Sequence, residues 1–357
     1  MKQCSLCSRV RIDNNLWCQE PYCPAERAPI RLQTGDFVGE LEIIKWVTTL
    51  PAATLYQARQ SGLPVLLKLA HPGLEDKLKR EAIFLQTHSH PGLPQLLSAH
   101  SDSTVVTHPY GKVTLRGQVL AYAIFASSDG RTARELLLRN AQPWHRHTGW
   151  IIAGLADTIA YLHDCGLYHL ALSPEVVLVR WDSQRIPRPL LVDLGIAAVY
   201  EDIGRYWRPQ LVTPSYLVPE LRQKQPAGPQ SDVFGLGLML HEMLSGERNR
   251  SFASSSIVER AKMQSVTQVQ EIARPDLRGL PHLATRSTHP AREYRPADVL
   301  VFANELLAYI PTVPSEKHKN RLRNHILRAV AVLALMISVV CLLAILLDIV
   351  IHRWSPM

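Results

Sequence analysis

The hydrophobic pattern between residues 38 and 310 changes its period once along the chain. Short runs rich in apolar and β-branched residues come first, with turn residues between them, and they indicate an antiparallel meander. These runs are residues 37–47, 54–59, 64–70 and 120–126. Helical spacing of apolar residues dominates after them. A small β-rich part followed by a helical part predicts an α+β fold.

Two segments carry apolar residues at helical spacing. In residues 75–88, Leu78, Ala82 and Leu85 fall on one face of a helix. Residues 150–166 repeat the pattern and stop at Gly166, a residue that often ends a helix. The chain has 357 residues, of which 46% are hydrophobic and 20% are charged. This composition is sufficient for a large hydrophobic core and excludes disorder of the whole chain.

Six motifs between Val38 and Ile310 resemble, in their order, those of the eukaryotic-like Ser/Thr protein kinase family. They are VLLKLA, KREAIFL, LVDLGIA, TPSYLVPEL, SDVFGLGLMLHEMLSGE and HPAREYRPADVLVFANEL. The resemblance implies a bilobal kinase-like domain over residues 38–310, with a small β-rich N-lobe and a helical C-lobe. It also implies ATP and Mg²⁺ as the cofactors to be considered.

The resemblance assigns nucleotide-binding roles to three residues. Lys68 matches the lysine that pairs with the phosphates, and Glu81 matches the helix glutamate that pairs with that lysine. Asp193 matches the magnesium-binding aspartate, with Leu194 in place of phenylalanine. Taken without the family, Lys68 could extend along the strand to solvent, Glu81 could be an exposed helix charge, and Asp193 could end a strand.

Three further matches imply structural roles. Glu220 and Arg295 match a buried ion pair of the family, and Asp232 matches a carboxylate that the resemblance places at the start of the central helix of the large lobe. These residues support the fold and carry no prediction of activity.

The segment that resembles the catalytic loop, YHLALSPEVV, has lost its charged working residues. Ala171 stands where the family has the aspartate that orients the substrate hydroxyl, Ser173 replaces a lysine, and Val176 replaces the asparagine that binds the second Mg²⁺. The arginine of the family is also replaced, by Leu170. The positions that still match are His169, Leu172, Pro174 and Glu175. We therefore expect no catalytic residue in this loop.

The phosphate-binding turn departs from the family as well. Glycines let backbone N–H groups approach phosphate oxygens closely, but residues 48–56 contain no glycine, and Pro51 lacks an N–H group. Tight phosphate binding by this turn is not expected.

Four of the six cysteines lie within the first 23 residues. Cys4 and Cys7 are separated by two residues, and Cys18 and Cys23 by four, which suits a tetrahedral Zn²⁺ site. We predict a structural, zinc-ribbon-like knuckle over residues 1–28. Disulfides and redox sensing are the alternatives.

The C-terminal part predicts a membrane anchor. Residues 329–347 are nineteen residues without a charge, long enough to cross a hydrocarbon core of about 30 Å, and we predict a transmembrane helix over 329–351. A buried core helix is the alternative. A basic juxtamembrane segment, 311–328, precedes it, and its residues 315–328 carry five Lys/Arg against one Glu, which suits anionic lipid. The distribution of positive charge, with no apolar signal peptide at the N-terminus, predicts a single-pass protein with its N-terminal domains in the cytoplasm.

The sequence thus predicts a membrane-anchored, cytoplasm-facing pseudokinase that acts as a signalling scaffold or interaction protein, with weak ATP binding left open. Its protein partners are not indicated. The alternative is a divergent, active Ser/Thr protein kinase that uses another carboxylate, such as Glu175 or Asp193, to transfer phosphate from ATP to protein. A zinc-dependent nucleic-acid-binding protein is a third hypothesis. It rests only on the cysteines and the net charge of +8, much of which lies in the basic segment, so nucleic acid is an unlikely partner.

Overall fold

The computed structural model describes residues 31–99, 108–115, 117–196, 198–208, 211–246 and 277–310, together with two short strands at 2–3 and 10–11. The chain divides into two compact units, Met1–Pro311 and Thr312–Met357. All of the second unit lies outside the described residues.

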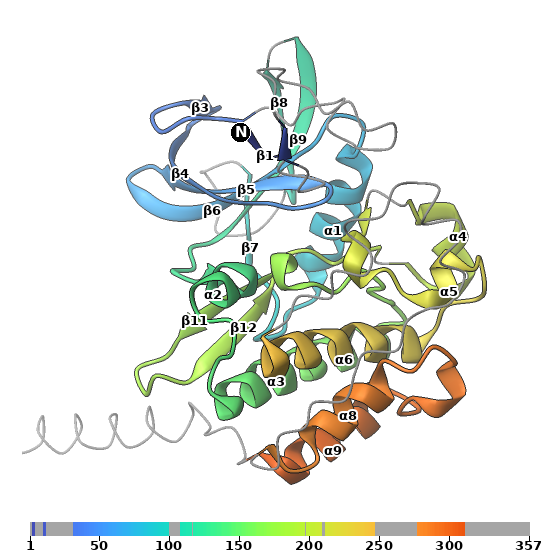
Figure 1. The fold of residues 1–357 in the computed structure, drawn as a ribbon. Helices are drawn as coiled ribbons and strands as arrows, with labels where there is room; N and C mark the ends of the chain where they lie inside the picture. The colour runs from blue at the N-terminus through green and yellow to red at the C-terminus, as the bar shows by residue number, and fades with distance from the viewer. Residues whose placement is uncertain are drawn as a thin grey trace, which may run out of the picture. The chain divides into compact units, whose positions relative to one another are not determined.

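The N-terminal part of the first unit is built on a seven-stranded sheet whose strand pairs are all antiparallel (Figure 1). The strand order is β3-β4-β5-β6-β9-β7, with β8 paired to β9. The strands are β3 Phe37–Val38, β4 Leu41–Thr49, β5 Ala53–Gln60, β6 Leu63–Ala70, β7 Leu96–Leu97, β8 Gly111–Leu115 and β9 Gln118–Ala126. The predicted meander is therefore confirmed. The structure adds the two-residue strand β7 and the strand β8, whose five residues alternate between more and less buried positions.

One helix, α1 (Glu75–Thr87), packs against β9 of this sheet. It buries the predicted apolar face of Leu78, Ala82 and Leu85. Two charged side chains, Lys77 and Glu81, are also buried on this helix. The sheet and α1 together position the charged residues of the N-lobe.

The C-terminal part of the unit is mainly helical (Figure 1). Its α-helices are α2 Ala133–Arg139, α3 His145–Asp164, α4 Ile203–Tyr206, α5 Pro219–Arg222, α6 Pro229–Ser245, α8 Leu280–Ser287 and α9 Val299–Tyr309. Helix α3 packs against α6 and α9, and α6 packs against α8. A small antiparallel sheet accompanies them, formed by β10 Arg131–Thr132, β11 Val177–Trp181 and β12 Pro187–Leu191.

Helix α6 is the central helix of this lobe. It begins at Pro229, three residues before the Asp232 that the resemblance marks as its start, because proline suits the first turn of a helix. It ends before Gly246, which adopts the left-handed conformation at φ 73°. From Ser231 to Leu244 every residue is buried, as expected of a helix surrounded by other elements.

The predicted zinc knuckle and membrane anchor fall outside the described residues. Strands β1 (Lys2–Gln3) and β2 (Val10–Arg11) pair antiparallel, but Cys4, Cys7, Cys18 and Cys23 are not described. The described ranges contain no cluster of three or more His, Cys, Asp or Glu side chains suited to a metal ion. Nor does any helix in those ranges have the length and apolar character needed to cross a bilayer. Both calls stay predictions.

Candidate active site

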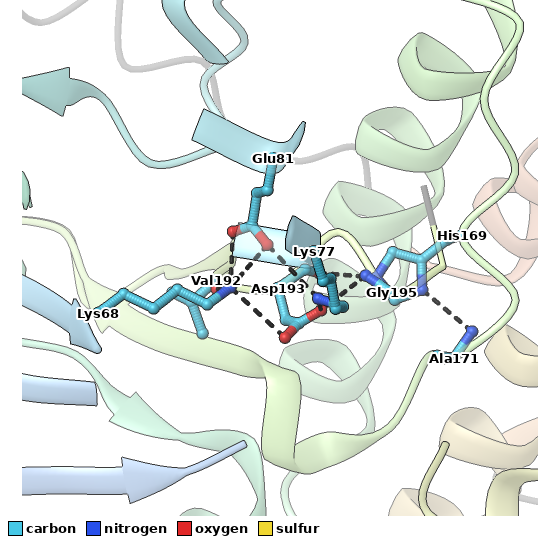
Figure 2. Close-up of polar contacts among 8 residues, drawn as sticks. All are labelled: Lys68, Lys77, Glu81, His169, Ala171, Val192, Asp193 and Gly195. Carbon is cyan, nitrogen blue, oxygen red and sulfur yellow. Dashed lines mark hydrogen bonds and ion pairs between the residues drawn. The ribbon is translucent and has the colours of Figure 1, made fainter. Parts of the chain in front are cut away.

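Lys68 and Glu81 form a buried ion pair (Figure 2). Lys68 lies on β6, and its Nζ donates to Oε1 and Oε2 of Glu81 at 2.6 and 2.8 Å. Both side chains are almost fully buried, with 1% and 2% of their surface exposed. Lys68 therefore does not extend to solvent, and Glu81 is not a surface charge. The structure brings the two residues together as the resemblance implies, while their binding of nucleotide stays a prediction.

Asp193 follows β12 and lies beside the same lysine. Lys68 Nζ is 3.4 Å from Asp193 Oδ2 and donates to the carbonyl of Val192 at 2.9 Å. The backbone N–H of Gly195 donates to Asp193 Oδ1 at 2.7 Å. All three residues predicted for the nucleotide site therefore lie in one cluster.

A fourth charged residue, Lys77, belongs to this cluster and was missed by the sequence prediction. Its Nζ donates to Asp193 Oδ1 at 2.5 Å and lies 3.5 Å from Glu81 Oε2 (Figure 2). The available signal was its position four residues before Glu81, which places both side chains on one face of α1. That spacing alone is also typical of an exposed helix pair, so it did not reveal that Lys77 is buried.

The cluster holds its charges by mutual attraction. Burial alone would raise the pKa of Asp193, but Lys68 and Lys77 outweigh it and hold that pKa well below its usual range. Burial alone would lower the pKa of Lys77, but Asp193 and Glu81 outweigh it, so this pKa is raised. Asp193 and Lys77 are therefore both charged at neutral pH.

The part of the catalytic loop that matches the family motif is held by buried hydrogen bonds. The backbone N–H groups of His169 and Leu170 donate to the two oxygens of Asp232 at 2.9 and 2.7 Å. His169 Nδ1 accepts from the N–H of Ala171 at 3.2 Å, so Nε2 carries the proton and donates to the carbonyl of Asp193 at 2.7 Å. Asp232 and His169 thus shape the loop without needing a side chain at position 171.

The positions that carry the family's chemistry are buried and uncharged. Ala171, Ser173 and Val176 are exposed by 3%, 0% and 1%. Ser173 Oγ accepts from Thr213 Oγ1 at 3.2 Å. Neither Ala171 nor Val176 can accept a proton or bind a metal ion through its side chain.

The two carboxylates considered as substitute bases are both ion-paired. Glu175 accepts from Arg134 Nε at 2.8 Å, and the same guanidinium also pairs with Glu242. Asp193 is held by Lys68 and Lys77. For Asp193 this pairing lowers the pKa and makes the carboxylate a weaker base.

The turn that replaces the glycine-rich loop is closed on itself. Leu50 N–H donates to the carbonyl of Ala53 at 2.8 Å, and His71 N–H donates to that of Ala52 at 2.9 Å. Leu50 is fully buried and Ala52 is 3% exposed. Because Pro51 has no N–H group and the amide of Leu50 is already bonded, this turn offers few donors to a phosphate.

His71 lies between this turn and the charged cluster. Its Nε2 is 2.9 Å from Thr54 Oγ1. Burial lowers the pKa of His71 to about 4, and this effect exceeds the opposing ones of the Pro51 backbone and the Asp193 charge. His71 is therefore neutral at physiological pH.

Acidification should destabilise the fold through His71. Because its folded pKa of about 4 lies below the unfolded value of 6.5, the unfolded chain binds more protons between these pH values. The stability that the neutral ring contributes is present above pH 6.5 and falls by about 3 kcal/mol as the pH drops to about 4. Buried His169, whose pKa is also lowered by burial, acts in the same direction.

Urea unfolding of the full chain at several pH values measures this effect. H71Q should flatten the pH dependence between 6.5 and 4. Its control, H282Q, replaces an exposed histidine of α8 and should leave the slope unchanged. A slope that is the same in H71Q and in the unsubstituted chain would contradict the assignment.

The site lies within a span that matches a known domain. A sequence model described as the protein kinase domain matches residues 65–317, more than half of the chain. The chain belongs to the protein kinase family. The match includes Lys68, Glu81 and Asp193, and also the altered loop around Ala171.

Curated members of the family with similar sequences are named as protein kinases. Serine/threonine-protein kinase dkf-2 of Caenorhabditis briggsae is 26% identical over 193 residues, which are 53% of this chain and 15% of that protein. Calcium/calmodulin-dependent protein kinase type 1 of Macrobrachium nipponense is 24% identical over 189 residues, 53% of this chain and 50% of that one. PkaA of Streptomyces coelicolor, a serine/threonine-protein kinase, is 29% identical over 146 residues, 40% of this chain and 26% of that one. The chain thus spans half or less of these relatives.

Solved structures of the family have the same fold. The PknI kinase domain of Mycobacterium tuberculosis superposes with a TM-score of 0.55 at 20% identity, covering 78% of this chain and 100% of that domain. At this identity the likeness shows the fold alone. It confirms the bilobal kinase fold, with a β-rich N-lobe and a helical C-lobe.

Proposed function

We propose that this chain is a pseudokinase, a member of the family that binds a nucleotide weakly and transfers phosphate very slowly or not at all. The observation that carries the proposal is the catalytic loop, in which Ala171, Ser173 and Val176 are buried in place of charged working residues. The backbone of this loop is still held by Asp232. The scaffold of the loop is kept, and its chemistry is lost.

The proposed loss of activity follows from the chemistry of phosphoryl transfer. Ala171 has no carboxylate to orient the hydroxyl nucleophile or to take its proton. The loss of such a general base alone reduces the rate of phosphoryl transfer by about 10²–10⁴-fold. Ser173 supplies no positive charge to the moving phosphoryl group, and Val176 supplies no metal ligand. The effects of these losses are not additive, but each lowers the rate.

Weak nucleotide binding is proposed on the basis of the Lys68–Glu81 pair. The pair holds the Lys68 ammonium beside Asp193, where the family places a phosphate-binding lysine. A bound nucleotide would favour one arrangement of the two lobes, which a protein partner could recognise. In this proposal the domain acts as a signalling scaffold.

Removal of the Lys68 ammonium should abolish nucleotide-dependent stabilisation. In the unsubstituted full chain, ATP at about ten times its Kd should add about 1.4 kcal/mol of stability, measured as a rise in Tm of a few degrees. K68A should show no rise relative to its own ligand-free Tm. K112A, in the exposed part of β8, is the matched control and should respond like the unsubstituted chain. An equal response of K68A would refute binding at this site.

The second candidate is an active, divergent Ser/Thr kinase. The comparisons support this alternative better than the pseudokinase, because the similar curated proteins are named as kinases. The assembled Lys68–Glu81 pair is compatible with it. Transfer of labelled phosphate from ATP to the chain itself or to a generic protein, lost in K68A, would establish the alternative and reject our proposal.

Membrane attachment and zinc binding complete the proposal. We propose that the span at 329–351 and the basic residues 315–328 anchor the kinase-like domain to the cytoplasmic face of a membrane, and that Cys4, Cys7, Cys18 and Cys23 hold a structural Zn²⁺. Retention of the chain in washed membranes, lost when residues 329–357 are deleted, tests the anchor. One bound zinc per chain, lost in a C4S/C7S variant, tests the knuckle.

A further inference from the structure

The carboxylate of Asp193 is already surrounded by donors from this chain (Figure 2). Oδ1 accepts from Lys77 Nζ at 2.5 Å and from the N–H of Gly195 at 2.7 Å. Oδ2 lies 3.4 Å from Lys68 Nζ. Each oxygen of this carboxylate therefore has an ammonium group as a neighbour.

This arrangement does not suit a divalent metal ion. Mg²⁺ requires nearly octahedral oxygen ligands at about 2.0–2.1 Å, and the nitrogen of Lys77 occupies the approach to Asp193 Oδ1. A metal ion there would have to displace a buried ammonium or lie against it. Val176, at the position of the family's second metal ligand, offers no side-chain oxygen. The donor set thus disagrees with the metal that the family implies.

The charges of the cluster lead to the same conclusion. Lys68 and Lys77 balance Glu81 and Asp193, so these four buried side chains are neutral as a group. Without Lys77 they would carry one negative charge, which is what attracts a cation. Lys77 therefore removes the electrostatic reason for binding a metal ion at this carboxylate.

Lys77 also keeps a means of contacting a phosphate. An ammonium has three N–H donors. The ammonium of Lys77 contacts two acceptors, Asp193 Oδ1 and Glu81 Oε2. It is the most exposed of the four side chains, at 7% against 1–3% for the others. Among the described residues, these two carboxylates are the acceptors that Lys77 Nζ contacts, which leaves one N–H group for a ligand that enters beside Asp193.

We propose that Lys77 is a built-in cation that takes the place of the divalent metal ion at Asp193, so that a nucleoside phosphate binds to this chain in its metal-free form. The proposal rests on the nucleotide binding proposed above and specifies which form of the ligand is bound. Lys68 and Lys77 together would supply the positive charge that the phosphate oxygens need.

The first test compares metal-free and metal-bound nucleotide on the unsubstituted full chain. Binding of ATP, and separately of ADP, is measured by isothermal titration and by thermal shift in EDTA and in excess MgCl₂. We expect binding in EDTA with a Kd no weaker than that in excess Mg²⁺, because Mg²⁺ competes with Lys77 for the phosphate oxygens. Binding only in Mg²⁺ would overturn the inference and leave nucleotide binding intact. Absence of binding in both buffers would overturn nucleotide binding and the inference together.

The second test replaces Lys77 and uses Lys79 of the same helix as its control. K77M should weaken ATP binding in EDTA by about tenfold or more, as expected for the loss of a charged hydrogen bond, and should make binding respond to Mn²⁺ or Mg²⁺. K79M removes a lysine that pairs with the exposed Asp76 and should change neither result. If K77M does not fold, K77R keeps the charge, and the comparison of buffers on the unsubstituted chain still decides. Unchanged metal-free binding by a folded K77M would overturn the role of Lys77.

Discussion

Substitution of Arg295 by methionine should lower the free energy of unfolding by about 3–5 kcal/mol, because it leaves a buried carboxylate without its cation. Arg295 Nη1 donates to Glu220 Oε1 at 2.6 Å. The two residues are 5% and 3% exposed. The guanidinium also lies 4.8 Å from the centre of the Phe234 ring and donates to three backbone carbonyls, those of Gln230, His289 and Pro290. Methionine replaces none of these polar contacts.

Urea unfolding of the full chain measures the loss, and two variants show its cause. R292M removes a nearby exposed arginine and should change stability by no more than about 0.5 kcal/mol. The double variant E220L/R295M removes both charges and should recover much of the loss, because a buried ion pair and a well-packed apolar pair are often similar in stability. A loss below about 1 kcal/mol in R295M would show that Glu220 finds another partner or reaches water.

The location of this pair explains why its effect should extend beyond one contact. Glu220 lies on the short helix α5, and Arg295 lies between α8 and α9. The carbonyl of Gln230 brings the first turn of α6 into the same network. One guanidinium therefore joins segments that are far apart in the sequence. Its structural role was predicted from the resemblance and is confirmed by the geometry.

The sequence predicted those features that depend on local pattern or on a complete motif. The meander β4-β5-β6 and helix α3 follow from the periodicity of apolar residues, and the Lys68–Glu81 pair follows from two motifs. Strand β7 was missed because two residues are too few to show an alternation. Strand β8 was missed although its five residues alternate, so the pattern needed to find it was present. Strand β9 begins two residues and helix α6 three residues before the predicted starts, because apolar periodicity does not define the ends of an element.

Lys77 shows the limit of prediction from one chain. A lysine four residues before a glutamate on a helix is usually an exposed pair. It becomes buried here because Asp193, 116 residues later in the sequence, lies against it. A pattern of neighbouring residues in the sequence cannot show a contact between residues so far apart. The sequence therefore predicted which residues of the site carry charge according to the family, but missed the cation that completes the cluster.

Backbone hydrogen bonds hold the altered catalytic loop in shape, so we expect that substitutions can restore its catalytic residues. Asp232 holds the backbone N–H groups of His169 and Leu170, and His169 holds that of Ala171. None of these bonds depends on the side chain at position 171. An aspartate introduced there should therefore be placed in the loop without rebuilding the backbone.

Restoration of the three working residues should raise phosphoryl transfer by about 10²-fold or more over the unsubstituted chain, which is the smaller end of the effect of a positioned proton acceptor. The variant is A171D/S173K/V176N, assayed on the full chain by transfer of labelled phosphate from ATP. Its matched control, A171N/S173K/V176N, keeps the size of the side chain at 171 and removes the acid–base function. Thermal melts select the variants that remain folded, because all three positions are buried.

The position of Lys77 sets the metal dependence of this result. With Lys77 on Asp193, the carboxylate that binds Mg²⁺ in the family is still occupied by an ammonium. Mg²⁺ neutralises the charge that develops on the phosphates. Addition of K77M to A171D/S173K/V176N should therefore increase the rate further and make it dependent on Mg²⁺. K79M in the same background should have no effect. If the unsubstituted chain already transfers phosphate at about 1 s⁻¹, the ordinary rate of a kinase, and A171D/S173K/V176N is no faster, the chain is an active enzyme with a different base.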